Sequence, residues 1–138
     1  AEIPTKFEAG TGAIAQAVGL GAAIDYVSRI GPEAIAAYEQ SLITYATERM
    51  AQVPGLRQIG TTRNKIGVFS FVLEGFTVEE VGKALDQEGI AVRGGHHCAV
   101  PALRHFGLEK TVRPSLAMYN TFEEIDFLIE VLRRIQSR

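Results

Sequence analysis

The spacing of apolar residues divides the first part of the chain into helices. From Gly12 to Ile30 apolar residues recur at intervals of three and four, which predicts a helix. Gly31 suits a left-handed cap at its end, and Pro32 fits the first turn of a second helix over 32–52. The first eleven residues show no such period, and we expect them to be extended.

The rest of the chain alternates short apolar runs with further helices. Strands are predicted at 56–59, 67–73, 90–93 and 112–117, and the run 67–73 (GVFSFVL) is expected to be buried on both faces or nearly so. Capping boxes at Thr77 and Thr121 predict two helices, and 101–106 suits a short one. The predicted fold class is therefore α+β, a small and mainly antiparallel sheet covered by helices.

The first predicted helix is apolar on most sides until Asp25, and it contains several glycines. Such a helix is usually buried on several faces, more than a domain of 138 residues can cover alone. We therefore expect residues 1–31 to be a connecting segment and long helix that leads from a missing large domain. Residues 32–138 would form a C-terminal small domain. The absence of an initial Met also suggests a fragment.

Composition narrows the possible partners. Hydrophobic residues make up 46% and charged residues 22% of the chain, which is typical of a globular protein. The formal net charge of -2 gives no broad basic field for nucleic acid or an anionic membrane. A single cysteine excludes an internal disulfide framework, and no apolar run approaches the roughly 20 residues that span a bilayer. With no secretory signal in the sequence, we expect a cytoplasmic protein.

The segment 93–99 (RGGHHCA) concentrates the candidate chemistry. Cys98 follows His96 and His97 and lies five residues after Arg93, a setting that favours a nucleophilic thiolate. The alternative is that Cys98 is a small buried hydrophobic residue. A zinc site built from these residues and His105 is a weaker alternative, because adjacent residues rarely reach one ion without strain. We therefore predict no metal.

Two further candidates have a structural and a functional interpretation. Arg113 lies in a predicted apolar strand, where it could form a buried ion pair or hold a substrate carboxylate with its guanidinium group. Arg93 has the same two interpretations. Thr11 precedes the first helix, where it could bind an anion such as phosphate, or where Thr11 or Gly12 could simply cap the helix.

Four motifs in this order resemble one family: FEAGTG, GLGAAIDYVSRIG, GIAVRGGHHCAVP and VRPSLAMYNTFEEID. They are similar to the C-terminal third of the type II (SufS/CsdB-like) cysteine desulfurases. These are fold-type I enzymes of the aminotransferase class V superfamily, and they use pyridoxal 5'-phosphate (PLP). The resemblance extends from Phe7 to about Ile135 and implies the C-terminal small domain of that fold.

The resemblance implies a role for each candidate residue. Cys98 would attack the sulfur of the cofactor-bound substrate and become a persulfide. Arg113 would hold the substrate's α-carboxylate, and Arg93 would lie beside the cysteine and the substrate. Thr11 would reach the cofactor phosphate of the other subunit in a homodimer. The two histidines before the cysteine would shape the loop and tune its thiol.

The sequence also departs from the family pattern. Lys6 stands where the family has an arginine, and Gly94 stands where alanine or threonine is common, which suggests a looser loop. The family's cofactor-binding lysine lies in a large-domain motif that no lysine of this chain matches. The chain carries Lys6, Lys65, Lys83 and Lys110. We therefore expect the 138 residues to be inactive alone.

The activity implied for the whole protein is conversion of L-cysteine to L-alanine and a cysteine persulfide for iron–sulfur cluster assembly. A SufE/SufU-type protein would accept the sulfur, and L-selenocysteine is the alternative substrate of a selenocysteine lyase. One different hypothesis is a free-standing small domain that serves as a sulfur carrier or interaction module. Another is an aminotransferase or lyase without sulfur chemistry, against which the thiol motif argues.

Overall fold

The computed structural model describes residues 1–137, and their contacts divide the chain into two units. The first unit covers residues 1–36, and the second begins at Ala37. Within residues 1–137, no helix combines the length and the apolar character that crossing a membrane requires.

The first unit contains a 3₁₀ turn, η1 (Thr5–Phe7), and the helix α1 (Ile14–Ile30). The turn replaces part of the extended segment that we predicted. The alternative in which Thr11 or Gly12 caps the helix is wrong, because Ala13 is the N-cap residue and no side chain caps the end. Gly31 ends α1 with a φ of 96°, but its ψ of 118° differs from that of the predicted left-handed cap.

The helix α1 carries apolar side chains that nothing in residues 1–137 buries. Val18 remains 70% exposed and Leu20 62% exposed, and these two side chains do not lie on one narrow stripe. The sequence predicts such an apolar surface for a helix that leads from a further domain.

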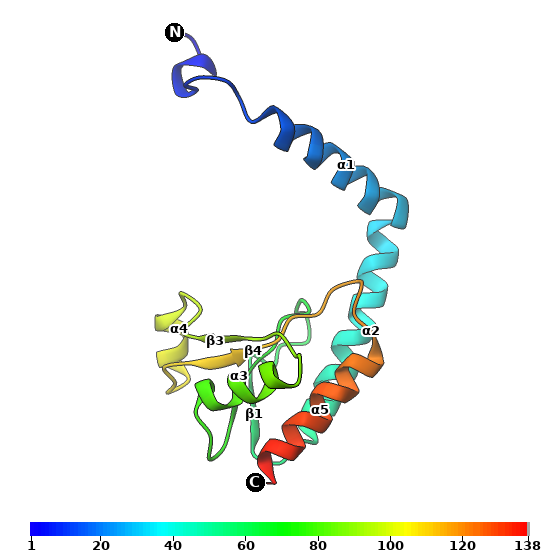
Figure 1. Ribbon diagram of the computed structural model, residues 1–138, viewed down its shortest axis with the longest axis vertical. Helices are drawn as coiled ribbons and strands as arrows, with labels where there is room; N and C mark the ends of the chain where they lie inside the picture. Colours follow the sequence, from blue (N-terminus) through cyan, green and yellow to red (C-terminus); the bar gives the residue numbers. More distant parts are fainter. Residues whose placement is uncertain (138) are drawn as a thin grey trace. The chain divides into compact units, whose positions relative to one another are not determined.

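The second unit is built on a four-stranded antiparallel sheet in the order β1-β2-β4-β3 (Figure 1). The strands are β1 (Leu56–Ile59), β2 (Ser70–Leu73), β3 (Arg93–Gly95) and β4 (Thr111–Arg113). The antiparallel pairing and the helices around the sheet confirm the predicted α+β class.

Four helices complete the fold: α2 (Pro32–Ala51), α3 (Val78–Gln87), α4 (Val100–His105) and α5 (Phe122–Gln136). In Figure 1, α2 and α5 lie side by side, and the Tyr45 hydroxyl of α2 donates a 2.8 Å hydrogen bond to Asp126 of α5. Both predicted capping boxes are present, at Thr77 and at Thr121. They fix where α3 and α5 begin.

The core lies on one face of the sheet. Phe71 of β2 is paired with Val112 of β4, and both side chains are fully buried in a cluster that α2, α3 and α5 complete. Burial alternates along β2, since Ser70 and Val72 are only half-buried. The strand predicted to be buried on both faces or nearly so is therefore fully buried on one face and half-buried on the other, because the core lies on one face only.

The same alternation separates the residues of β4. Because successive side chains point to opposite faces of a sheet, Thr111 and Arg113 lie on the face opposite the core residue Val112. The strand β4 is shorter than predicted, because Pro114 has no N–H to continue the ladder. The strand β3 begins where its prediction over 90–93 ends, since pairing with β4 selects Arg93 and the two glycines after it.

Candidate active site

The strand pair β3–β4 brings the predicted site residues together. Arg93 lies directly opposite Arg113 in the antiparallel register, and Gly95 lies opposite Thr111. The chain then runs from Gly95 through the segment 96–99, which we call the cysteine loop, into α4. Residues that face each other on antiparallel strands project to the same side, with Cβ atoms about 4.5–5.5 Å apart.

The cysteine loop holds two non-glycine residues in the left-handed region. His97 has a φ of 53° and Cys98 a φ of 56°. Such residues cost about 1–3 kcal/mol each and persist only where surrounding contacts hold them. Two contacts do so here: the Ala99 amide donates to the His96 carbonyl at 2.9 Å, and the Cys98 amide donates to Nδ1 of His96 at 3.0 Å.

The turn leaves Cys98 exposed to solvent. The alternative of a buried hydrophobic cysteine is therefore wrong. Its backbone amide donates to His96. Its thiol lies at the surface, on the loop that follows β3. Access of this kind is one of the features that distinguish reactive cysteines from structural ones.

His97 anchors the cysteine loop to β4. Its Nε2 lies 3.0 Å from the Thr111 carbonyl oxygen and 3.1 Å from the Thr111 hydroxyl. A carbonyl only accepts, so Nε2 carries the proton and donates it. Nδ1 is then the unprotonated nitrogen; it is buried and has no hydrogen-bond partner within residues 1–137.

Electrostatics favours the same neutral form of His97. Burial lowers the pKa of His97 below its ordinary value, although the hydrogen bond to the Thr111 carbonyl opposes this effect. The positive charges of Arg113 and Arg93 lower the pKa further. Both effects disfavour a second proton on the imidazole.

Neither arginine has an ion pair or a side-chain hydrogen bond within residues 1–137. The structural interpretation of Arg113, a buried ion pair, therefore finds no partner among these residues. The physical reason is the alternation of β4, which turns Arg113 away from the core. Two like charges directly opposite each other are destabilising, and an anion placed between them would relieve the repulsion. A carboxylate also matches the guanidinium fork.

Gly94 has a packing reason to lack a side chain. A Cβ atom at this position would lie 3.1 Å from Cγ1 of Val78, the first residue of α3. The glycine therefore lets β3 approach α3 closely. Close packing of this strand contrasts with the looser loop that departure from the family pattern suggested.

Three of the four lysines have a partner of their own. Lys110 pairs with Glu79, Lys65 lies 4.4 Å from the centre of the Phe69 ring, and Lys6 lies over the ring next to it in sequence. No group of three or more histidine, cysteine or acidic residues is arranged to hold a metal ion within residues 1–137. The site residues that the β3–β4 pair and the cysteine loop bring together include no lysine amine, which PLP needs for covalent binding.

Thr11 belongs to the first unit, in the bend before α1, and it is exposed. Its predicted phosphate contact stays a prediction. The structure therefore unites five of the predicted site residues around the β3–β4 pair, namely Arg93, His96, His97, Cys98 and Arg113.

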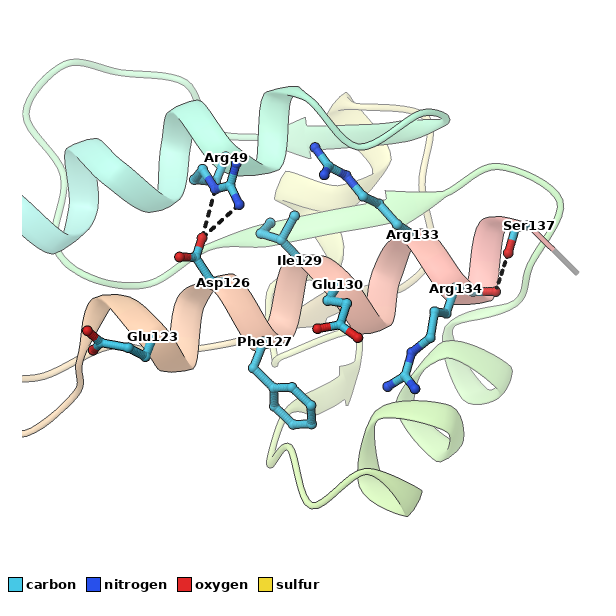
Figure 2. A pocket seen from close by; sticks show the side chains of 9 residues that line it. All are labelled: Arg49, Glu123, Asp126, Phe127, Ile129, Glu130, Arg133, Arg134 and Ser137. Carbon is cyan, nitrogen blue, oxygen red and sulfur yellow. Dashed lines mark hydrogen bonds and ion pairs between the residues drawn. The ribbon is translucent and has the colours of Figure 1, made fainter.

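A groove between α2 and α5 lies elsewhere on the second unit (Figure 2). Its charged side chains include Arg49 and Asp126, which form an ion pair 2.8 Å long, while Phe127 contributes an aromatic side. None of its lining residues comes from β3, β4 or the cysteine loop. The groove therefore takes no part in the chemistry around Cys98.

Comparisons with known proteins identify the family of the chain. The family model described as "Aminotransferase class-V" matches residues 1–128. The chain therefore belongs to the aminotransferase class-V family, whose enzymes depend on PLP.

Within that family the chain is similar to cysteine desulfurases. It is 64% identical over 134 residues to the cysteine desulfurase of Synechococcus elongatus, covering 97% of this chain and 21% of the relative. The apo structure of the cysteine desulfurase from Thermococcus onnurineus NA1 matches with a TM-score of 0.89 and 38% identity, over 98% of this chain and 34% of that one. The chain thus spans about a fifth to a third of these relatives.

The fold by itself does not choose the reaction. The cystine C–S lyase C-DES, solved with its reaction product cysteine persulfide, shares the fold with a TM-score of 0.75 at 21% identity. That match covers 96% of this chain and 32% of the lyase. The choice therefore rests on the residues of the site.

Sequence reasoning missed two features of the site. One is Thr111, which is polar and buried. Its only signal in the sequence is its place two residues before Arg113, which puts both side chains on the same face of a strand. The other is the direct opposition of Arg93 and Arg113, which depends on strand register. Both features arise from pairing between segments that lie far apart in the sequence.

Proposed function

We propose that this chain is the C-terminal part of a PLP-dependent cysteine desulfurase, in which Cys98 accepts the sulfur of L-cysteine. The observation that carries the proposal is an exposed cysteine on a left-handed turn beside two directly opposed arginines without ion pairs in the described chain. The identity to desulfurases supports it.

The arginines explain how the substrate would be oriented. The guanidinium group of Arg113 would hold the α-carboxylate in a two-point contact, with Arg93 beside it. This contact would relieve the repulsion between the opposed charges. The substrate's thiol end would then be free to face the neighbouring cysteine loop.

The sulfur transfer balances without any further reactant. Sγ of Cys98, as the thiolate, bonds to the sulfur of the substrate, and the substrate's Cβ–S bond breaks. The electron pair stays with the substrate carbon, which takes a proton to give L-alanine, and Cys98 becomes a persulfide. PLP supplies the electron sink for the substrate carbon when it is bound.

The other elements of the proposal concern the longer protein. Residues 1–31 would connect a large domain, which would bind the cofactor, to the small domain over 32–138. Thr11 would contact the cofactor phosphate of the second subunit in a homodimer. A SufE/SufU-type protein would accept the persulfide sulfur for iron–sulfur cluster assembly, in the cytoplasm. His96 and His97 would shape the cysteine loop.

The test uses the full-length protein that contains this chain. We expect PLP-dependent release of alanine from L-cysteine, and a Cys98→Ala variant that transfers no sulfur to an acceptor protein. This variant changes Cys98 alone. A normal cofactor absorption band would show that its fold is intact. Sulfur transfer by Cys98→Ala would contradict the proposal.

The same experiment separates the alternatives. Selenocysteine lyase activity would appear as alanine release from L-selenocysteine that does not require Cys98. A full-length protein no longer than this chain and without a cofactor band would instead favour a sulfur carrier or interaction module.

A further inference from the structure

Thr111 is a buried polar residue on the face of the sheet away from the core. It is 0% exposed and is the one polar residue among the buried side chains described within residues 1–137. A buried hydroxyl needs a hydrogen-bond partner, and the His97 ring provides a contact at 3.1 Å. Because Nε2 is the donor, the Thr111 hydroxyl accepts in this contact, which also anchors the His97 side chain.

This contact joins the two halves of the site. His97 directly precedes Cys98, while Thr111 lies two residues before Arg113 on the same face of β4. A change in the His97–Thr111 contact would therefore shift the thiol relative to the guanidinium group that we propose to hold the substrate. No other side-chain hydrogen bond within residues 1–137 links the cysteine loop to β4.

His97 is poorly placed to exchange protons with a substrate. Its Nε2 is occupied by Thr111, and its Nδ1 is buried without a partner within residues 1–137. Its backbone, however, has a positive φ that a β-carbon disfavours, and so has that of Cys98. The geometry of His97 therefore suits an anchor better than an acid or a base.

We propose that Thr111 is a positioning residue, which acts through His97 to hold Cys98 at the correct place beside Arg113. The proposal rests on the proposed function. The hydroxyl and the carbonyl of Thr111 hold the imidazole of His97, and His97 is one of the two left-handed residues of the turn.

The test compares two substitutions in the full-length protein. Thr111→Val keeps the shape and burial of the side chain but removes its hydroxyl, whereas Thr111→Ser keeps the hydroxyl. We expect Thr111→Val to lower kcat for alanine release about three- to tenfold, the loss of one neutral hydrogen bond, with KM for cysteine unchanged. Thr111→Ser should restore kcat to within about twofold of the wild type. An equal loss in both variants would overturn the proposal.

A double-mutant cycle tests whether Thr111 acts through His97. His97→Asn shortens the side chain so that it cannot bridge to Thr111, while asparagine tolerates a positive φ. If one residue acts through the other, the double variant should be no slower than the slower single variant. Rate losses that multiply in the double variant would overturn the proposal.

The alkylation rate of Cys98 provides a readout that needs no turnover. Iodoacetamide modification is followed by mass spectrometry of the peptide that contains Cys98. We expect Thr111→Ser to match the wild type, and Thr111→Val, His97→Asn and the double variant to share one altered rate. If the variants share this altered alkylation rate but the wild type releases no alanine, the proposed function is wrong and the role of the Thr111–His97 contact is supported. Alanine release without the pattern overturns the anchor.

Discussion

At the scale of single residues, the site depends on backbone conformation and strand register. Cys98 is exposed because the turn before it is left-handed, and Arg113 is turned away from the core because Val112 points into it. A shift of the β4 pairing by one residue would turn Arg113 toward the core.

The role of Arg113 leads to a prediction about substrate affinity. Arg113→Lys keeps the charge but loses the planar two-point contact, so kcat/KM for L-cysteine should fall about 10- to 100-fold, mainly through KM. Steady-state kinetics of the full-length protein measure this. Arg57→Lys is the matched control, because Arg57 lies on β1, at the edge of the sheet opposite β3, where it donates to the Phe106 carbonyl. An unchanged KM in Arg113→Lys would contradict the carboxylate contact.

The candidate residues were largely predictable from the sequence, but their arrangement was not. Cys98 is recognisable because two histidines and an arginine precede it within a few residues. Thr111 is not recognisable in this way, because its importance comes from a contact with His97 across 14 residues of chain. Similarly, Arg113 looked like a buried ion-pair partner until the register of β4 was known.

At the scale of elements, Gly67 controls how the segment before β2 meets the segment after β4. A Cβ atom on Gly67 would lie 2.5 Å from the Leu116 carbonyl oxygen, and the Gly67 carbonyl accepts a 2.6 Å hydrogen bond from the Leu116 amide. The two backbones can approach this closely only because residue 67 has no side chain.

Gly67→Ala should therefore lower the free energy of unfolding by about 1–3 kcal/mol, the usual cost of overpacking. Urea denaturation of the 138-residue protein measures it. Gly82→Ala in the middle of α3 is the control: nothing lies within 4 Å of its Cβ position, and alanine should stabilise the helix by about 0.5–1 kcal/mol. Equal effects of the two substitutions would contradict the close approach.

Helices were easier to predict than strands because their signals are local. The capping boxes at Thr77 and Thr121 mark α3 and α5 within a few residues of sequence. The bounds of β3 were predicted too early, because an apolar run indicates burial whereas a strand is defined by its partner. Similarly, the apolar run 67–73, which contains β2, predicts burial on both faces or nearly so, but burial of a strand depends on how many helices cover the sheet.

At the scale of the whole molecule, the most prominent feature is the exposed apolar surface of α1. The chain spans about a fifth to a third of its relatives, and α1 leaves residues such as Val18 and Leu20 uncovered within residues 1–137. Contiguous apolar surface of this kind promotes association.

We therefore predict that the 138-residue protein self-associates as its concentration rises, as measured by light scattering. Replacing Val18 and Leu20 together by Glu should reduce this association, because charges at exposed apolar positions oppose contact. Gln16→Glu, an exposed polar position on the same helix, is the control and should change it little. A wild type that stays monodisperse at every concentration would contradict the prediction and favour a free-standing domain.

The central claim is that Cys98 receives the sulfur of L-cysteine, and its mass tests this most directly. The full-length protein is incubated with L-cysteine in the absence of a reductant, and the peptide that contains Cys98 is weighed. We predict that this peptide gains the mass of one sulfur atom as alanine accumulates, and that a reductant reverses the gain. An unmodified Cys98 peptide in a protein that releases alanine would contradict the account.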